Sequence, residues 1–389
     1  MIPSFDRIII LADESANWKI SGLRQLDRLA LALDEFARSI SSQRKIDIVI
    51  FWHPAIAAEQ RWQPENPRLS RCQFVEGLSV GASTRLLNTR LLVRRGGLEQ
   101  LLGAAFSLES DPAIADELAV WKKLWLGIED RRVAAGSSTI NAAWRYLANS
   151  NEIPSAERWL LRGSGKSHDG FVSRYLNRPI SRAVSRLLLK TSMTPNRWTR
   201  LITLIPLIGF LLLVRGDYLG FVTGAALFQV HSILDGCDGE LARAKYLDSE
   251  KGPGLDALGD LIALLLFSLG LGFGLFRAAD ASSVVRWAFL GEGLLAFLFI
   301  AARLGPHTLD LLHRGPAAVV SSEHDESLRN SGGRILGAHF TGWAFELTKR
   351  DVVFLAFLVL AVLGLARSIL HLLFVYSLVT LLLRHQSRR

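Results

Sequence analysis

Apolar and polar positions are distributed differently in the two halves of the chain. Up to about residue 191, apolar and charged residues are mixed as in a soluble protein, and apolar runs dominate after that point. Six runs approach the ~20 residues that a perpendicular membrane span requires. They lie at 198–214, 218–234, 255–276, 284–302, 352–366 and 369–383. The pattern predicts a soluble domain followed by an all-α domain of six transmembrane helices, residues 193–389.

The last two runs are separated only by Arg367 and Ser368. So short a separation predicts either a tight hairpin or a re-entrant pair. The residues between the fourth and fifth runs, which include SSEHDESLRNSGGR, are predicted to form a polar loop.

Residues 1–165 show the pattern of a soluble α/β domain. The runs RIIILAD (7–13) and KIDIVIFWHP (45–54) predict strands, and 22–40 has apolar residues at helical spacing. A strand, helix and strand in this order predict a parallel, Rossmann-like sheet. The later stretch TRLLNTRLLVRRGGLEQLL predicts another strand and helix.

The connector, residues 166–192, predicts an amphipathic helix. Its basic residues recur every four positions and its apolar residues fall opposite them. The basic set is Arg174, Arg178, Arg182, Arg186 and Lys190, and the apolar set is Leu176, Ile180, Val184 and Leu187. Such a helix lies at a membrane surface with its cations toward anionic headgroups. The alternative is a basic soluble helix packed on the first domain. Pro179 is expected to begin or kink the connector helix.

The net charge of +9 comes partly from basic residues beside the apolar runs. Such residues mark the cytoplasmic side of membrane proteins, so six spans place both termini in the cytoplasm. No recognition motif accompanies the charge, and no nucleic-acid partner is predicted. The start MIPSFDRIII has no signal-peptide pattern, and Cys72 and Cys237 are predicted to be free thiols. We expect a multi-pass protein of the cell (inner) membrane with its first domain in the cytoplasm.

Four carboxylates lie between the second and third apolar runs, in DGCDGELARAKYLDSEKGPGLDALGD. Asp235 and Asp238 are spaced i,i+3, and Asp256 and Asp260 are spaced i,i+4, so each pair lies on one helix face. Antiparallel spans bring both pairs to the cytoplasmic face, where four charges would repel one another. Two divalent cations would balance them, and carboxylate oxygens favour Mg²⁺ or Mn²⁺. The alternative is that each aspartate is a helix cap or a solvated charge.

The spacing of these aspartates, with Gly239, Ala242, Arg243 and Gly252, resembles the signature of the CDP-alcohol phosphotransferase (CDP-alcohol phosphatidyltransferase) family. The resemblance implies six membrane helices and two metal ions held by four aspartates. It also implies transfer of a substituted phosphate from a CDP-alcohol, such as CDP-diacylglycerol or CDP-inositol, to an acceptor alcohol, with release of CMP. A homodimer and contact with membrane lipids are compatible with it.

The resemblance also implies roles for single residues. Asp235, Asp238 and Asp256 match metal ligands, and Asp260 matches a ligand that is also the general base. The nucleotide positions are Gly239, Ala242, Arg243 and Gly252, with Asn196 in a ThrProAsn stretch that also resembles the family. Arg303 is the candidate for binding a phosphorylated acceptor, and its alternative is an ordinary basic flank of a membrane span.

The first domain is similar to the nucleotidyltransferase-like domain of bifunctional inositol-1-phosphate cytidylyltransferase and phospho-inositol transferase fusions. Active domains of that class have a Gly-rich basic loop after the first strand, because bare backbone N–H groups cradle a triphosphate. Here the corresponding sequence is LADESANWKISG, with Asp13 and Glu14. A degenerate domain is favoured over a surviving cytidylyltransferase, with Lys19 as a remnant contact or a surface residue. His53 is interpreted as a packed histidine.

A different class of function is a catalytically silent membrane scaffold or sensor whose first domain binds nucleotide. The intact aspartate pattern argues against it. A transporter is disfavoured because the chain shows no inverted repeat of interrupted helices. The sequence leaves the donor and acceptor alcohols open.

Overall fold

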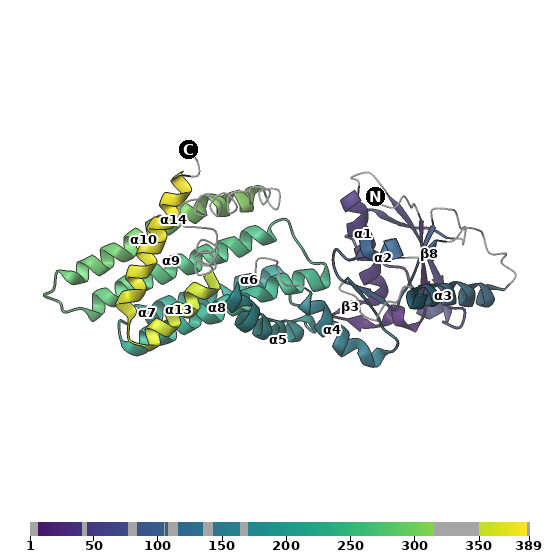
Figure 1. Cartoon of the computed structure of the whole chain (residues 1–389), viewed down its shortest axis with the longest axis horizontal. Coiled ribbons are helices and arrows are strands. Elements are labelled where there is room, and N and C mark those ends of the chain that lie inside the picture. The colour runs from purple at the N-terminus through teal and green to yellow at the C-terminus, as the bar shows by residue number, and fades with distance from the viewer. Residues whose placement is uncertain are drawn as a thin grey trace. The chain divides into compact units, whose positions relative to one another are not determined.

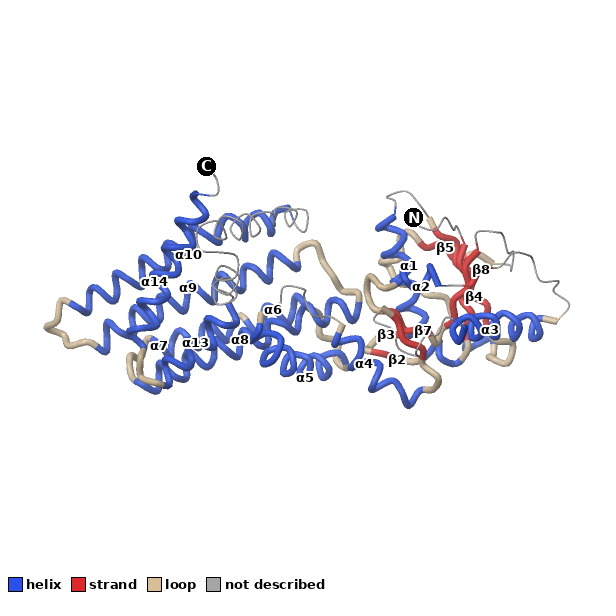
Figure 2. The backbone as a smooth tube through the Cα atoms, in the orientation of Figure 1, coloured by secondary structure: helices blue, strands red, loops and turns tan. Residues whose placement is uncertain are grey.

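The computed structural model describes residues 7–40, 45–76, 84–104, 106–107, 116–134, 143–163, 170–314 and 350–386. The predicted polar loop around 321–334 lies outside these residues. The chain divides into two compact units. The first comprises Met1–Ser164, Leu189–Thr191 and Arg243–Tyr246, and the second comprises Gly165–Leu188, Ser192–Ala242 and Leu247–Arg389. Figure 2 shows that the strands belong to the first unit and that the second is helical.

A five-stranded sheet forms the centre of the first unit, in the order β5-β4-β1-β6-β8. Its edge strand β8 is labelled in Figure 1. The strands are β1 (Arg7–Ala12), β4 (Ile46–Trp52), β5 (Cys72–Phe74), β6 (Thr84–Asn88) and β8 (Phe106–Ser107). All neighbours are parallel except β6 and β8. Two short antiparallel pairs accompany the sheet: β2 (Lys19–Ile20) with β3 (Leu23–Arg24), and β7 (Leu91–Val93) with β9 (Trp144–Tyr146).

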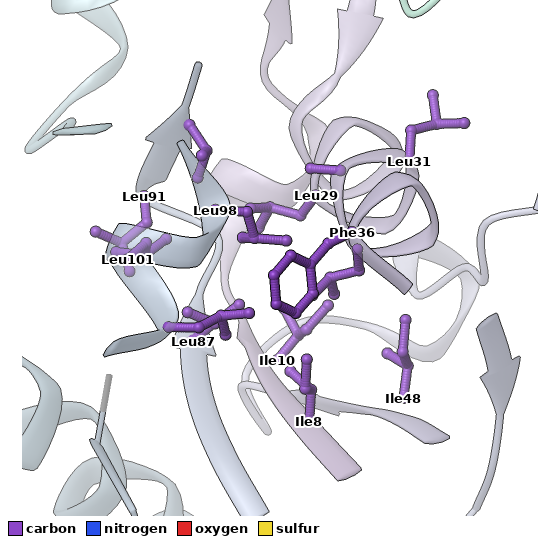
Figure 3. Close-up of a cluster of buried hydrophobic side chains, with 14 of the residues drawn as sticks. Ile8, Ile10, Leu29, Leu31, Phe36, Ile48, Leu87, Leu91, Leu98 and Leu101 are labelled. Carbon is purple, nitrogen blue, oxygen red and sulfur yellow. The ribbon is translucent and has the colours of Figure 1, made fainter. Parts of the chain in front are cut away.

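The apolar run of β1 is continuous because both faces of the sheet are covered. Ile8 and Ile10 pack in a cluster with Leu29 of α1 (Gln25–Ile40), as Figure 3 shows. Ile9 and Leu11 pack on the other side with residues of α3 (Glu117–Ala134). The helices α2 (Leu98–Ala104) and α4 (Ile153–Arg162) complete the unit. The predicted α/β class is confirmed.

The helix predicted over 22–40 begins later, at Gln25. Ser21 and Gly22 have φ of 51° and 79° and form the turn between β2 and β3. Positive φ at two successive residues is incompatible with an α-helix, so the chain enters α1 only after the short hairpin.

The second unit contains the helical part of the chain. Its helices are α5 (Arg178–Leu189), α6 (Pro195–Ile202), α7 (Leu204–Leu213), α8 (Tyr218–Lys245), α9 (Gly252–Ala278), α10 (Val285–Arg314), α13 (Arg350–Val362) and α14 (Ala366–Gln386), and the last residues of α5 and α8 belong to the first unit. All six predicted segments are helical. Within the described residues, three stretches are long and apolar enough to cross a membrane: Pro195–Leu213, Gly252–Ala278 and Val285–Arg314. An α/β domain followed by an all-α domain is therefore confirmed.

Two boundaries differ from the predicted ones for reasons of backbone chemistry. The first predicted span is broken at Thr203 into α6 and α7, because Pro206 has no N–H to donate to Ile202 and its ring crowds that carbonyl. The final turn lies before Arg367, at Gly364, whose φ is +76°. The Leu365 N–H donates to the Leu360 carbonyl across this glycine, which is the closure of a helix that ends on a left-handed residue.

Aromatic rings and glycines pack the helical unit. Phe267 of α9 lies 4.9 Å from Phe228 of α8 and 5.2 Å from Phe357 of α13, between ring centroids. The helices α9 and α10 approach closely at two glycines: a Cβ added to Gly293 would lie 2.8 Å from the Cα of Gly272. Small residues of this kind let helix backbones meet in a membrane.

We predict that Gly293→Ala destabilises the protein and that Gly291→Ala, on the same helix, does not. The added methyl group at Gly293 meets backbone that cannot rotate away, which costs about 1–3 kcal/mol. The same group at Gly291 meets no described atom within 4 Å. Thermal unfolding of the detergent-purified variants measures the difference. An equal or higher midpoint for Gly293→Ala would contradict the close approach.

Candidate functional site

Two neighbouring helices supply the four aspartates. Asp235 and Asp238 lie on α8, which continues past the predicted end of its apolar run to Lys245, and Asp256 and Asp260 lie in the first turns of α9. Oxygen atoms from Asp235, Asp238 and Asp256 all lie within 4.8 Å of one another. The structure therefore brings together three of the four predicted ligands, and Asp235 is buried.

The helix α6 fixes Asp238. Thr199 Oγ1 donates to Asp238 Oδ2 over 2.8 Å, and the Gly239 N–H donates to Asp238 Oδ1. One residue before Thr199, the Trp198 indole N–H donates to the Leu234 carbonyl over 3.0 Å. Gly259 of α9 is buried, and a Cβ added to it would lie 3.6 Å from Thr203 Oγ1. Thr199 therefore links α6 to α8, and Gly259 of α9 lies beside the residue that follows α6.

Asp260 and Asp235 share one cationic partner. Arg350, the first residue of α13, contacts Asp260 Oδ1 through Nη1 and Asp235 Oδ2 through Nη2, the latter at 2.5 Å. Opposite charge at this range offsets the repulsion among the carboxylates. Sequence reasoning missed Arg350, because a basic residue before an apolar run has the ordinary meaning of a cytoplasmic flank.

The donor set fits a hard divalent cation. Three carboxylates with converging oxygens and no nitrogen or sulfur ligand are what Mg²⁺ and Mn²⁺ prefer over zinc. The positive charge of Arg350 would repel a cation that is bound beside Asp235. Binding of a cation between the aspartates would weaken the hold on this guanidinium.

A cavity of about 330 Å³ opens beside Asp260. It is enclosed by α9, α10, α13 and α14, and its polar lining includes Asp260, Arg303, His307, Arg350, Tyr376 and Thr380. Arg303 donates from Nη1 to the Tyr376 hydroxyl over 3.2 Å. The predicted acceptor residue therefore lines the same cavity as the predicted base, and a second arginine joins it there.

The residues predicted to bind nucleotide are divided between the two units. Asn196 Nδ2 donates to Ser249 Oγ over 3.2 Å, and the Ser249 carbonyl accepts from the Gly252 N–H over 3.0 Å at the start of α9. Gly239 and Ala242 lie on α8. Arg243 belongs to the first unit, where it lines a cavity of about 310 Å³ together with Arg28, Arg94 and Arg95.

The segment after β1, where an active nucleotidyltransferase has its triphosphate loop, is a short 3₁₀ helix, Glu14–Asn17, capped by Asp13. Asp13 Oδ1 accepts from the Ser15 N–H at 2.9 Å and from Thr89 Oγ1 at 3.2 Å, and Oδ2 accepts from Arg90 Nε at 2.9 Å. Partial burial opposes the charge of Arg90, but Asp13 raises the pKa of Arg90 above its ordinary value. Both oxygens of the buried Asp13 carboxylate therefore accept hydrogen bonds from within the fold.

Two other residues of the first domain have ordinary surroundings. His53 lies edge-on to Trp121 with 4.4 Å between ring centroids, and its Nδ1 accepts from the Ala55 N–H. Lys19 is exposed on β2. A packed histidine and a surface lysine agree with the simpler interpretation of each.

Comparison with known proteins finds similarity over part of the chain. Residues 193–319 match the model of the CDP-alcohol phosphatidyltransferase family. Proteins named "Bifunctional IPC transferase and DIPP synthase" are similar to this chain. The one from Thermococcus kodakarensis is 39% identical over 132 residues, which are 32% of this chain and 29% of the relative. The one from Rubrobacter xylanophilus is 36% identical over 162 residues, which are 41% and 36% of the two chains.

A further protein of that name, from Aquifex aeolicus, is 30% identical over 155 residues, or 40% of this chain and 35% of the relative. The chain thus spans about a third of the length of the curated relatives it matches. Their shared name agrees with the predicted similarity to bifunctional fusions. The resemblance to the CDP-alcohol phosphatidyltransferase family, predicted from the aspartate pattern, is confirmed for residues 193–319.

Proposed function

We propose that the chain is a membrane-embedded CDP-alcohol phosphotransferase. It would transfer a substituted phosphate from a CDP-alcohol to an acceptor alcohol and release CMP, in the synthesis of phospholipids or phospho-polyols. The observation that carries the proposal is the convergence of Asp235, Asp238 and Asp256 within a segment that matches the family.

Two Mg²⁺ or Mn²⁺ ions would be held by Asp235, Asp238 and Asp256, with Asp260 completing the set. When bound, such ions neutralise phosphate oxygens and stabilise the charge that builds up on the leaving CMP. The hydrogen bonds to Asp238 support this role, because they orient its carboxylate before any ion arrives.

Asp260 would be the general base. It lines the acceptor cavity, so an acceptor hydroxyl in that cavity lies within reach of its carboxylate. As the new bond between the acceptor oxygen and phosphorus forms, the bond from phosphorus to the bridging anhydride oxygen breaks and CMP leaves with that electron pair. The proton of the hydroxyl passes to Asp260.

Arg303 and Arg350 would bind a phosphorylated or otherwise anionic acceptor. Both line the cavity from different helices, and each planar guanidinium group can donate two hydrogen bonds to a pair of phosphate oxygens. The Tyr376 hydroxyl supports Arg303 through its hydrogen bond. Gly239, Ala242, Arg243, Gly252 and Asn196 would hold the nucleotide, and the Asn196 contact with Ser249 orders the loop before α9.

The basic flanks of the membrane helices support an active site and a first domain on the cytoplasmic side of the cell (inner) membrane. The connector supports contact with membrane lipids, because Tyr175, Ile180 and Leu187 are exposed apolar residues beside exposed cations. In the first domain, the engaged carboxylate of Asp13 supports a degenerate rather than an active nucleotidyltransferase.

The reaction itself is tested by CMP release. Purified protein, supplied with CDP-diacylglycerol or CDP-inositol and a panel of alcohols and phosphorylated alcohols, is expected to release CMP only when Mg²⁺ or Mn²⁺ is added. Nucleotide binding without CMP release over the whole panel would contradict the proposal and favour a silent scaffold or sensor.

Metal titration is expected to separate Asp260 from the other aspartates. Asp235→Asn and Asp256→Asn weaken metal binding, so excess cation restores part of the CMP-release rate. Asp260→Asn loses the proton acceptor as well, so its rate stays roughly 10²–10⁴-fold lower at any concentration. Near-normal turnover of Asp260→Asn at saturating Mg²⁺ would show that another group is the base.

Arg303→Ala is expected to raise the KM for phosphorylated acceptors at least tenfold and to leave the KM for the CDP-alcohol unchanged. The matched control is Arg286→Ala, at the other end of α10, where the guanidinium lies over the Phe276 ring and outside the acceptor cavity. Initial rates over a range of acceptor concentrations measure both. Equal effects of the two substitutions would contradict an acceptor role for Arg303.

A further inference from the structure

A buried ion pair lies within the aspartate segment itself. Glu240, two residues after Asp238, is completely buried, and its Oε1 accepts from Arg178 Nη1 at 3.2 Å and from Ser181 Oγ at 2.8 Å. The side chain of Arg178 is only 8% exposed. Taking two opposite charges out of water is costly unless both stay paired, so the contact is maintained as a unit. Arg178 was predicted to face lipid headgroups with the other connector cations; that prediction is wrong, because this guanidinium turns inward to meet Glu240.

The ion pair lies on the far side of α8 from the aspartates. At 100° per residue, Glu240 is rotated by about 200° from Asp238 and about 140° from Asp235. The aspartates therefore face α9 and α6, whereas Glu240 faces the connector helix α5.

Several further contacts hold α5 and the residues before it along α8. Cys237 Sγ donates to the Ser181 carbonyl at 3.4 Å, and Gln229 Nε2 donates to Asn177 Oδ1 at 3.1 Å. A Cβ added to Gly236 would lie 3.1 Å from Arg178 Nη1. These contacts extend over twelve residues of α8, 229–240, or about 16 Å of helix. The connector is thus docked along α8 by buried polar bonds.

The rotation of α8 decides where its two aspartates point. A turn of 20° about the helix axis moves an oxygen that is ~6 Å from the axis by about 2 Å. Metal and catalytic sites tolerate displacements of only about 0.5 Å. Contacts on the opposite face of the helix are well placed to prevent such a turn.

We propose that the pair of Arg178 and Glu240, with Ser181, positions the metal-binding aspartates by fixing the rotation of α8. This inference rests on the proposed metal site and adds three positioning residues to it. The connector is then a part of the catalytic domain. Its exposed residues face lipid, and its buried residues hold α8 in place.

The test measures Mn²⁺ binding to the full-length, detergent-purified chain by the loss of the free Mn²⁺ signal in electron paramagnetic resonance. This readout does not depend on turnover. Arg178→Met is expected to weaken Mn²⁺ binding roughly 10–100-fold, the range found when groups that orient metal ligands are removed. Arg186→Met, an exposed arginine on the same helix, is the matched control and is expected to bind Mn²⁺ normally.

The double variant Arg178→Met/Glu240→Leu separates positioning from stability. An apolar pair leaves no lone buried charge, so its thermal unfolding midpoint is expected to return toward that of the unmodified protein. Its Mn²⁺ affinity is expected to stay low, because the hydrogen bonds that fix the rotation are gone. Normal Mn²⁺ affinity in the folded single or double variant would overturn the proposal and leave the pair with a purely structural role.

Parallel measurement of CMP release keeps the two proposals apart. If the unmodified chain binds Mn²⁺ and releases no CMP, the proposed function fails while the Mn²⁺ comparison still decides the positioning role. If it releases CMP and Arg178→Met binds Mn²⁺ with unchanged affinity, the positioning role alone fails.

Discussion

Repulsion among carboxylates at one end of the helical unit is the constraint on which the arrangement of the surrounding helices depends. Three aspartates have oxygens within 4.8 Å of one another, and Asp235 is buried. Such a cluster raises the free energy of the fold unless positive charge and hydrogen-bond donors surround it. Arg350 from α13 and Thr199 from α6 supply both. The same repulsion would favour the binding of a divalent cation between the carboxylates, as in the proposed metal site.

Residue size follows the distance between helices in the helical unit. Gly272 and Gly293 let α9 and α10 meet at backbone distance. Away from the cluster, aromatic rings of α8, α9 and α13 fill the interior. Glycines therefore lie where two helix backbones touch, and aromatic residues lie where side chains fill the space between helices. The cavity beside Asp260 lies between helices of this framework.

The first unit combines a largely parallel sheet with a carboxylate that is held at the end of its first strand. Its sheet has the parallel order and the two covered faces of the predicted class. At the end of β1, however, the Asp13 carboxylate accepts hydrogen bonds from Ser15, Thr89 and Arg90. A negative group held in this way repels a triphosphate, and the donors that could have received one are already engaged.

The sequence by itself determined the order of the domains, the helical segments and the meeting of Asp235, Asp238 and Asp256, because hydrophobic period and residue spacing are local properties of a chain. It could not place the final turn at Gly364 or the break at Thr203 without the backbone geometry of Gly364 and Pro206. Only the tertiary structure decided the partners of the charges. Arg178, Arg303 and Arg350 look alike in sequence as basic residues near apolar runs, yet one meets Glu240, one lines the cavity beside Asp260 and one lies among the aspartates. Ion pairing depends on distance in space, and residues 62 and 115 positions apart in the chain become neighbours only when the helices pack.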